Sequence, residues 1–204
     1  QSANATWVPY GVPMGWKRES SMRLLVLPLG CKPPSLVLVK PWKILSSTAD
    51  ADYRVFKIRV DRAVSPRTNR TGEFYTLQSS HWVNVIPLTQ DQKVVMIRQY
   101  RHGSRKVTLE IPGGLVDEAD PKEAAIRELL EETGYAGPKV SLLGSTNPNP
   151  ALFDNLCYTY LVEDARKVGD ASLDVEEDIE VELVPLSSLP ALIQDGTINH
   201  ALVI

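Results

Sequence analysis

The chain has 204 residues, of which 43% are hydrophobic and 23% charged, enough apolar surface for one large domain or for a domain with a small addition. A net charge of -3 and a pI near 5.7 argue against a general affinity for nucleic acid or for an anionic membrane. The sequence holds no run of about 18 apolar residues, so we expect no membrane-spanning helix.

The two cysteines, Cys31 and Cys157, lie far apart in the sequence. This usage is more typical of inert thiols in a reducing cytoplasm than of a disulfide framework or a zinc site, so we expect a cytoplasmic protein. Pro28, Pro33, Pro34 and Pro41 interrupt the segment that leads to Trp42. Residues 1–41 are therefore expected to form a poorly structured arm, or a tag or upstream-translated segment.

The first predicted strand covers residues 53–61 (YRVFKIRVD), where apolar and polar side chains alternate. Two further strands are expected at 73–78 and 82–88. We expect residues 42–80 to form a small antiparallel sheet, followed by a larger α/β domain at 81–204.

The clearest predicted helix covers residues 121–132, with Pro121 in its first turn, Asp120 as its N-cap and Gly134 after its end. A short helix is expected at 187–194, and residues 197–204 resemble the opening of another. The remaining predicted strands are at 94–100, 107–111, 140–143, 156–162 and 179–185.

Glu128, Glu131 and Glu132 lie on one face of the predicted helix, at about 100° per residue. Such carboxylates repel one another unless a divalent cation binds them, and Mg²⁺ prefers oxygen ligands. A solvated charged face is the alternative interpretation. The preceding Gly113-Gly114 turn favours a metal, because glycine lets a backbone carbonyl approach a cation.

Residues 113–135 (GGLVDEADPKEAAIRELLEETGY) resemble the Nudix box, G-x5-E-x7-R-E-U-x-E-E-x-G-U, in which U is apolar. Ala119 departs from the pattern, because the box has its first glutamate there; Glu118 is adjacent, and Glu123 is spaced to pair with Arg127. This departure bears on the geometry of the loop more than on activity. The matching positions are Gly113, Arg127, Glu128, Leu129, Glu131, Glu132, Gly134 and Tyr135.

The resemblance implies a Nudix α/β/α sandwich with a mixed sheet and a hydrolase that uses Mg²⁺, for which Mn²⁺ can substitute. Arg127 would orient the glutamates and Glu131 would be an auxiliary ligand. The implied metal ligands are the Gly113 carbonyl, Glu128, Glu131 and Glu132.

Residues 98–101 (RQYR) and 109–114 (LEIPGG) resemble the ADP-ribose and nucleoside-diphosphate-sugar pyrophosphatase branch of this family. In that branch the second arginine of RQYR, here Arg101, reaches the substrate phosphates. A surface ion pair is the alternative role of Arg98, and turn formation that of Asn155. The candidate substrate-binding residues are Arg101, Arg98, Glu110 and Asn155.

The segment 175–179 (VEEDI) resembles the loop that supplies the general base in this branch. Glu177 is the first candidate for the base and Glu176 the second; a solvated acidic turn is the alternative. The candidate catalytic residues are Glu177, Glu176, Glu131 and Arg127. Candidates for an aromatic platform under the base are Trp42, Tyr75, Trp82 and Phe153.

The resemblance implies hydrolysis of ADP-ribose, GDP-mannose or a similar compound to a nucleoside monophosphate and a sugar phosphate, by a homodimer with exchanged N-terminal sheets. One alternative is a non-catalytic sensor of nucleotide sugars, which has little reason to retain mutually repelling glutamates. The other is a Nudix hydrolase of nucleoside triphosphates or dinucleoside polyphosphates, which the RQYR and PGG flanks disfavour.

Overall fold

The computed structural model describes residues 39–117 and 120–204. The expected arm therefore lies almost wholly outside the described residues, as do Cys31, Glu118 and Ala119. Pro41–Ile204 form one compact unit. In the described ranges, no helix combines the length and the apolar character needed to cross a membrane.

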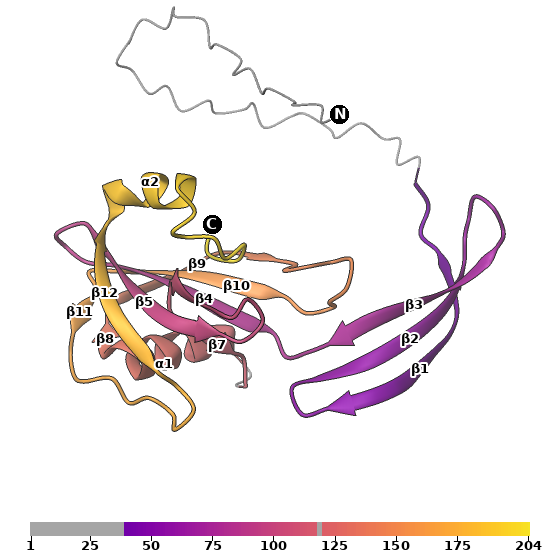
Figure 1. Cartoon of the computed structure of the whole chain (residues 1–204), viewed down its shortest axis with the longest axis horizontal. Coiled ribbons are helices and arrows are strands. Elements are labelled where there is room, and N and C mark those ends of the chain that lie inside the picture. Colours follow the sequence, from indigo (N-terminus) through magenta and orange to yellow (C-terminus); the bar gives the residue numbers. More distant parts are fainter. Residues whose placement is uncertain (1–38, 118–119) are drawn as a thin grey trace, which may run out of the picture. The chain divides into compact units, whose positions relative to one another are not determined.

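The N-terminal sheet consists of three antiparallel strands in the order β1-β2-β3 (Figure 1). The expected single strand at 53–61 is wrong, because Tyr53 ends one strand and Phe56 begins the next, and the two pair across a tight turn. The alternating pattern continues through this turn, and the polar first strand carries little apolar signal. The bounds are β1 Lys43–Tyr53, β2 Phe56–Val64 and β3 Thr71–Gln78.

The central sheet is mixed, with the strand order β12-β5-β4-β10-β9. Strand β10 runs parallel to β4, whereas the other pairs are antiparallel, and the short strands β6 and β7 pair with β5 and β4. The bounds are β4 Trp82–Leu88, β5 Lys93–Arg101, β6 Lys106–Glu110, β7 Gly113–Leu115, β9 Lys139–Thr146, β10 Cys157–Glu163 and β12 Ile179–Pro185. All five strands predicted after residue 90 are present, with ends shifted by a few residues at most.

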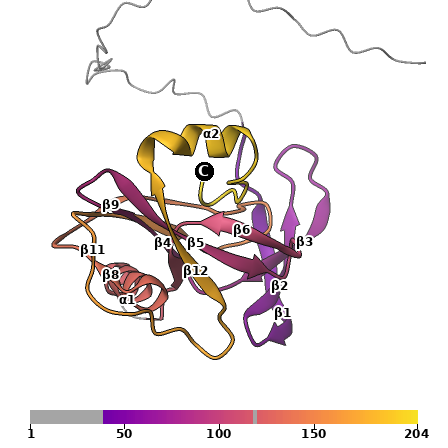
Figure 2. The ribbon, with the colours of Figure 1, turned by 60° about the vertical axis from the view of Figure 1, so that its left-hand side comes forward.

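Helices cover both faces of this sheet (Figures 1 and 2). Helix α1 (Pro121–Thr133) packs Ala124, Ala125 and Leu129 against apolar side chains of β4 and β10. The 3-10 turn η1 (Leu186–Ser188) and helix α2 (Leu189–Gln194) lie over a second cluster, built around Met96 and Leu109. The expected α/β/α sandwich with a mixed sheet is confirmed.

Helix α1 has the ends that its sequence predicts. The Asp120 side chain accepts a hydrogen bond from the Lys122 amide at 2.9 Å, which satisfies a donor in the first turn. Gly134 ends the helix at φ 71°, and its amide donates to the Leu130 carbonyl. Both caps fix the length of α1, and so the position of the glutamates in its last turns.

The residues after α2 do not form the expected helix. Their backbone makes a single turn, in which the Val203 amide donates to the His200 carbonyl. Ile198 is buried against the second core cluster, and the Asn84 side chain donates to the Leu202 carbonyl at 2.6 Å. These contacts hold the segment against the sheet in a non-helical path. The short pair β8 (Tyr135–Ala136) and β11 (Arg166–Lys167) was also not predicted.

Candidate active site

Gly113 and Gly114 do not form the expected turn: they begin strand β7, which pairs with β4 and requires glycine at both positions. A Cβ on Gly113 would lie 2.2 Å from the Val83 carbonyl oxygen, and one on Gly114 would lie 2.3 Å from Glu128 Oε1. Both distances are far below van der Waals contact. The two glycines therefore let the chain run between strand β4 and the glutamates of α1.

Glu132 is a buried carboxyl group at the C-terminal end of α1. Only 3% of the residue is exposed, and its Oε2 accepts a hydrogen bond from the Gly113 amide at 2.9 Å. Burial raises the pKa of Glu132 to about 8, and the charges of Glu128 and Glu177 act in the same direction. Burial without a cation thus makes the anionic form of Glu132 unfavourable.

Glu128 lies one turn earlier, and its side chain is 12% exposed. Burial raises the pKa of this carboxyl and outweighs the attraction of Arg127, whose Nη2 lies 3.0 Å from Glu128 Oε1. Arg127 Nη1 also donates to Glu131 Oε2 at 2.8 Å. Arg127 thus joins two of the three glutamates and holds them in one orientation.

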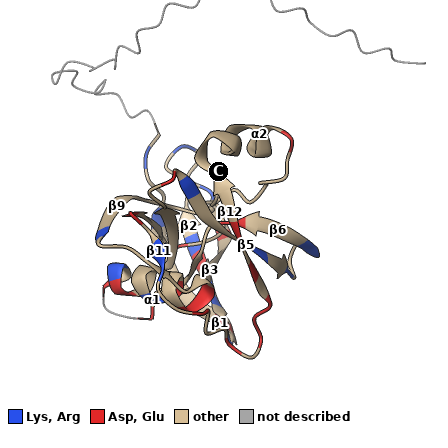
Figure 3. Cartoon of the chain, turned by 90° about the vertical axis from the view of Figure 1, so that its left-hand side faces the viewer, with Lys and Arg blue, Asp and Glu red and all other residues tan. Residues whose placement is uncertain are grey.

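Glu131 differs from its two neighbours because its side chain is 44% exposed. Helix α1 directs Glu128 and Glu132 toward Gly113 and Gly114 of strand β7, and it leaves Glu131 at the rim. Figure 3 shows the acidic residues of α1 and of the segment that leads into β12. The sequence predicted three carboxylates on one face, whereas the structure separates them into a buried pair and an outer member.

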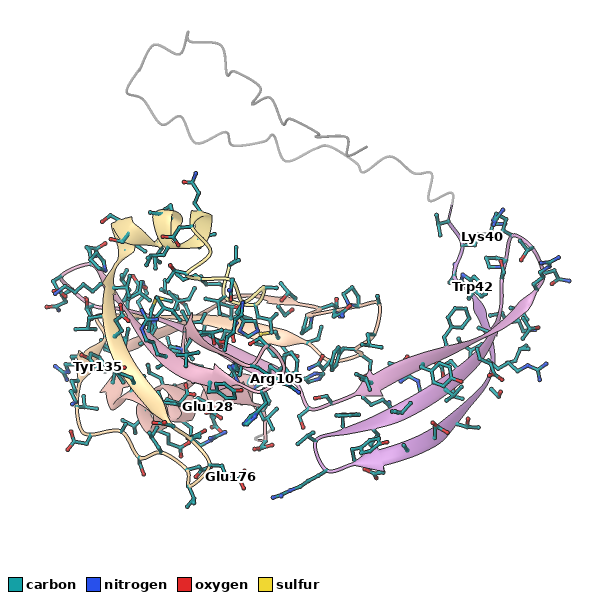
Figure 4. The ribbon with its side chains drawn as sticks, viewed as in Figure 1. Lys40, Trp42, Arg105, Glu128, Tyr135 and Glu176 are labelled. Carbon is teal, nitrogen blue, oxygen red and sulfur yellow. The ribbon has the colours of Figure 1, made fainter. Side chains whose placement is uncertain are left out.

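The acidic loop before β12 approaches this pair. The charge of Glu177 contributes to the raised pKa of both Glu128 and Glu132. Its Oε2 accepts a hydrogen bond from the Asp174 amide at 3.0 Å, and Ser172 anchors the loop by donating its amide to the Glu131 carbonyl. Figure 4 shows Glu176 on this loop and Glu128 on α1. Glu176 is exposed, and its charge is not among the causes of either pKa shift.

Arg101 lies at the end of β5 and pairs with Glu110, which is only 1% exposed. Arg101 Nη2 donates to Glu110 Oε2 at 2.7 Å, Thr108 donates to Oε1, and His200 Nδ1 lies 3.0 Å from Oε2. Burial opposes ionisation of Glu110, but these three neighbours outweigh it and lower the pKa to about 2. Arg101 also opposes the rise in the pKa of Glu132, so the Arg101–Glu110 pair lies close to the buried glutamates of α1.

A cavity of about 610 Å³ lies beside these groups. Its wall includes Gly113 and Gly114 of strand β7, Arg101, Glu110 and Trp82. Trp82 also stands 5.9 Å from Phe153, between ring centroids. Of the four aromatic candidates, Trp82 alone lines this cavity. An anionic diphosphate fits between Arg101 and the glutamates only if cations offset the carboxylate charge.

Two predicted substrate-binding residues lie elsewhere. Arg98 Nε donates to Glu182 Oε2 on the neighbouring strand at 2.7 Å, which is the ion pair considered as its alternative role. Asn155 is 1% exposed and donates to the Ser80 carbonyl at 3.0 Å. Neither residue lines the cavity. Their roles in substrate binding stay predictions.

The family model described as "NUDIX domain" matches residues 81–203. The chain belongs to the Nudix family. The match begins at the predicted start of the catalytic domain and spans the two faces of the sandwich. The chain is accordingly a hydrolase.

Among its relatives, a methanol dehydrogenase activator of Bacillus methanolicus is 34% identical over 140 residues, which cover 68% of this Nudix chain and 75% of that protein. An ADP-ribose pyrophosphatase of Bacillus subtilis is 29% identical over 121 residues, or 58% of this chain and 65% of that protein. A crystal structure of an ADP compounds hydrolase has a TM-score of 0.70 at 22% identity and covers 81% of this chain and 89% of its own. That likeness supports the fold.

Nudix hydrolases use divalent metal ions, and the donors of this Nudix chain suit one. Glu128 and Glu132 are buried carboxyls with raised pKa values, and the absence of a Cβ at Gly114 leaves room for the Glu128 carboxyl. In the ranges 39–117 and 120–204, no three His, Cys, Asp or Glu side chains already form a metal-ligand group. The fit therefore rests on the two buried glutamates and the adjacent backbone.

The sequence did not reveal that the last residues reach this site. Asn199, His200, Ala201 and Leu202 line the cavity. No sequence motif includes them, and the hydrogen bond between Asn84 and Leu202 joins residues 118 positions apart. Only the tertiary path of the chain brings His200 to Glu110.

Proposed function

We propose that this Nudix hydrolase cleaves the diphosphate bond of nucleoside diphosphate sugars such as ADP-ribose or GDP-mannose, and releases a nucleoside monophosphate and a sugar phosphate. The observation that carries the proposal is the pair Glu128 and Glu132 beside a cavity with Arg101 in its wall. The cavity size suits a small ligand. The relation to an ADP-ribose pyrophosphatase supports the same substrate class.

We propose Mg²⁺ as the metal, with Mn²⁺ as a substitute. The Gly113 carbonyl, Glu128 and Glu132 would hold it, and Glu131 would contribute from the rim. Oxygen donors of this kind suit Mg²⁺. When bound, the metal supplies positive charge to the diphosphate and activates the attacking water. Arg127 keeps Glu128 and Glu131 in place through its two ion pairs.

The substrate diphosphate would contact the guanidinium of Arg101, whose side chain is 43% exposed although Glu110 pairs with it. A fixed cation of this kind stabilises charge that develops on phosphate oxygens. Arg98 and Asn155 remain proposed substrate contacts that would have to act beyond the cavity wall. Glu177 is the proposed general base, since its charge contributes to the raised pKa of both buried glutamates. Glu176 is the second candidate.

The second candidate is a sensor that binds nucleotide sugars without turnover. It would bind its ligand through the same cavity, but it has no use for two desolvated carboxyls at its edge. Burying such groups costs free energy that a binding module could avoid with neutral side chains. Hydrolysis of nucleoside triphosphates or dinucleoside polyphosphates is the third candidate and shares all of the metal chemistry.

A substrate panel under one set of conditions tests these candidates. Purified protein with Mg²⁺ would receive ADP-ribose, GDP-mannose, ATP and a dinucleoside polyphosphate, and the products would be resolved by chromatography. We expect AMP and ribose 5-phosphate from ADP-ribose, and no product when EDTA replaces the metal. Tight ADP-ribose binding without any product would support the sensor, and preferred cleavage of the other two classes would reject the proposed substrate.

We further propose a homodimer with exchanged N-terminal sheets, in the cytoplasm. Residues 42–78 expose large apolar side chains that a partner would cover, namely Trp42, Ile44, Leu45, Phe74 and Tyr75. The free, buried thiol of Cys157 is compatible with a reducing compartment. Sedimentation equilibrium tests the dimer, and a monomer mass at all concentrations would reject it.

A further inference from the structure

One oxygen of the buried Glu110 carboxylate lies between two nitrogen groups. Arg101 Nη2 donates to Glu110 Oε2 at 2.7 Å, and the buried His200 Nδ1 lies 3.0 Å from the same oxygen as an ion-pair contact, with no aligned hydrogen bond among the described residues. Thr108 holds the other oxygen, Oε1. The carboxylate therefore has neighbours on both oxygens, which restricts its rotation.

His200 belongs to a turn that is itself fixed. The Ile198 side chain is 2% exposed within the second core cluster, and its amide donates to the Leu192 carbonyl at 2.9 Å. On the other side of His200, the Leu202 carbonyl accepts from Asn84 Nδ2 at 2.6 Å. Figure 2 shows this last segment passing close to β6, the strand that carries Glu110. His200 thus approaches Glu110 from a frame that the core and β4 define.

Arg101 needs such support because its side chain is long and extends into the cavity. Glu110 Oε2 is its shortest contact, whereas Arg101 Nε lies 3.2 Å from both carboxylate oxygens. Rotation of the carboxylate would move the guanidinium. Misplacement of a substrate-orienting group by about 1 Å can cost up to about 100-fold in rate. The position of Glu110 therefore controls the position of the cation that faces a ligand.

We propose that His200 is a positioning residue of the active site: it fixes the Glu110 carboxylate and, through it, the Arg101 guanidinium that meets the substrate diphosphate. This inference rests on the proposed function for its substrate. It assigns the last turn of the chain a role in presenting a phosphate-binding cation, in addition to closing one wall of the cavity. His200 itself need not touch the substrate.

The test is a double-mutant cycle with three replacements of His200. The amide nitrogen of Asn can occupy nearly the position of Nδ1, whereas that of Gln reaches nearer to Nε2. We expect His200→Ala and His200→Gln to lower kcat/KM for ADP-ribose by about 10-fold, and His200→Asn to stay within about threefold of wild type. In the Arg101→Ala background, His200→Ala should change kcat/KM by less than about twofold, because the guanidinium that His200 positions is absent.

Thr197→Ala is the matched control, since Thr197 is exposed on the same segment and does not line the cavity. Thermal unfolding of each variant identifies losses due to misfolding. The inference is overturned if His200→Ala equals wild type, if Asn and Gln act alike, or if the Arg101→Ala background leaves the effect of His200→Ala undiminished.

Inorganic pyrophosphate separates this inference from the proposed function. It presents a diphosphate without a base or sugar, and its affinity can be measured by calorimetry with Mg²⁺. If wild type leaves ADP-ribose intact, the proposed function fails, and the same cycle is then measured as pyrophosphate affinity. A loss of affinity in His200→Ala that Asn restores supports the inference, and equal affinity across the cycle overturns it.

Discussion

The amide of Gly113 donates to Glu132 Oε2 across 2.9 Å and thereby joins strand β7 to the last turns of helix α1. This bond gives the buried carboxyl one partner, but burial still raises its pKa to about 8. One backbone hydrogen bond does not replace the lost hydration of a carboxylate. The geometry therefore holds an acid in place for a cation to bind.

Replacing Glu132 by Gln tests the proposed metal site. Gln keeps the volume and can still accept from the Gly113 amide, so we expect the fold to persist. The charge is lost, and partners that only orient metal ligands already cost about 10- to 100-fold when removed. The Mg²⁺-dependent rate should therefore fall by more than about 100-fold. A Mg²⁺ titration at saturating ADP-ribose measures this, and a near-wild-type rate would contradict the assignment of Glu132 as a ligand.

The stability of metal-free protein should fall as the pH rises from about 4.5 to about 8. Across this window folded Glu132 holds a proton that the unfolded chain has released, so raising the pH favours unfolding, by at most about 1.4 kcal/mol per pH unit. Glu110 acts differently: its lowered pKa gives stability that is complete above about 4.5 and is lost as the pH falls toward about 2. It leaves the slope in this window unchanged.

Urea unfolding in EDTA at several pH values measures this slope. Glu132→Gln should reduce it, because the titrating group is gone, and excess Mg²⁺ should also reduce it by favouring the anionic carboxyl. A metal-free wild type whose stability rises steadily over the same pH range would contradict the prediction.

The secondary structure was predictable where local signals agree. Strand β12 and the caps of α1 follow from apolar patterning and from Asp120 and Gly134, which act within a few residues. The hairpin at Tyr53–Phe56 was missed because its turn lacks the Gly or Asn that usually marks one. The turn at His200 was missed because its conformation depends on contacts with distant strands rather than on its own sequence.

The site shows the same division between local and tertiary information. Helical spacing predicted a common face for Glu128, Glu131 and Glu132, but helical spacing does not determine burial. Only the approach of strand β7, with Gly113 and Gly114, separates two inward carboxyls from the exposed Glu131. Residues 98 and 101 are three apart on β5, so alternation places their side chains on opposite faces. It did not reveal that Arg98 meets Glu182 on another strand.

Alanine at the two glycines should separate catalysis from stability. At Gly114 the new methyl group meets the movable Glu128 carboxyl, so we expect the fold to survive while Mg²⁺-dependent activity drops by more than about 10-fold. At Gly113 it meets the Val83 backbone, which cannot move aside, so we expect a loss of about 1–3 kcal/mol in stability. Gly144→Ala is the control, because nothing lies within 4 Å of its Cβ. Thermal unfolding and kinetics of all three variants test this explanation, and equal effects at 113 and 114 would contradict it.

Arg101→Ala should lower kcat/KM for ADP-ribose by about 100-fold, since it removes a fixed cation from the diphosphate. It also removes a partner of the buried Glu110, so some stability should be lost too. Lys93→Ala, at the other end of β5, removes an exposed pair with Asp91 and should leave both properties nearly unchanged. Steady-state kinetics with thermal unfolding separate the two effects, and unchanged kinetics in Arg101→Ala would remove Arg101 from the site.

The two glutamates before β12 should differ strongly in their contribution to the rate. Glu177 is close enough to raise the pKa of Glu128 and of Glu132, whereas the charge of Glu176 is not among the causes of either shift. Removing a general base typically costs about 10²- to 10⁴-fold, so Glu177→Gln should lower kcat by that range with little change in KM. Glu176→Gln is the matched control on the same loop and should keep kcat within about threefold. The opposite pattern would assign the base to Glu176, and wild-type rates in both variants would mean that neither residue on this loop takes the proton from water.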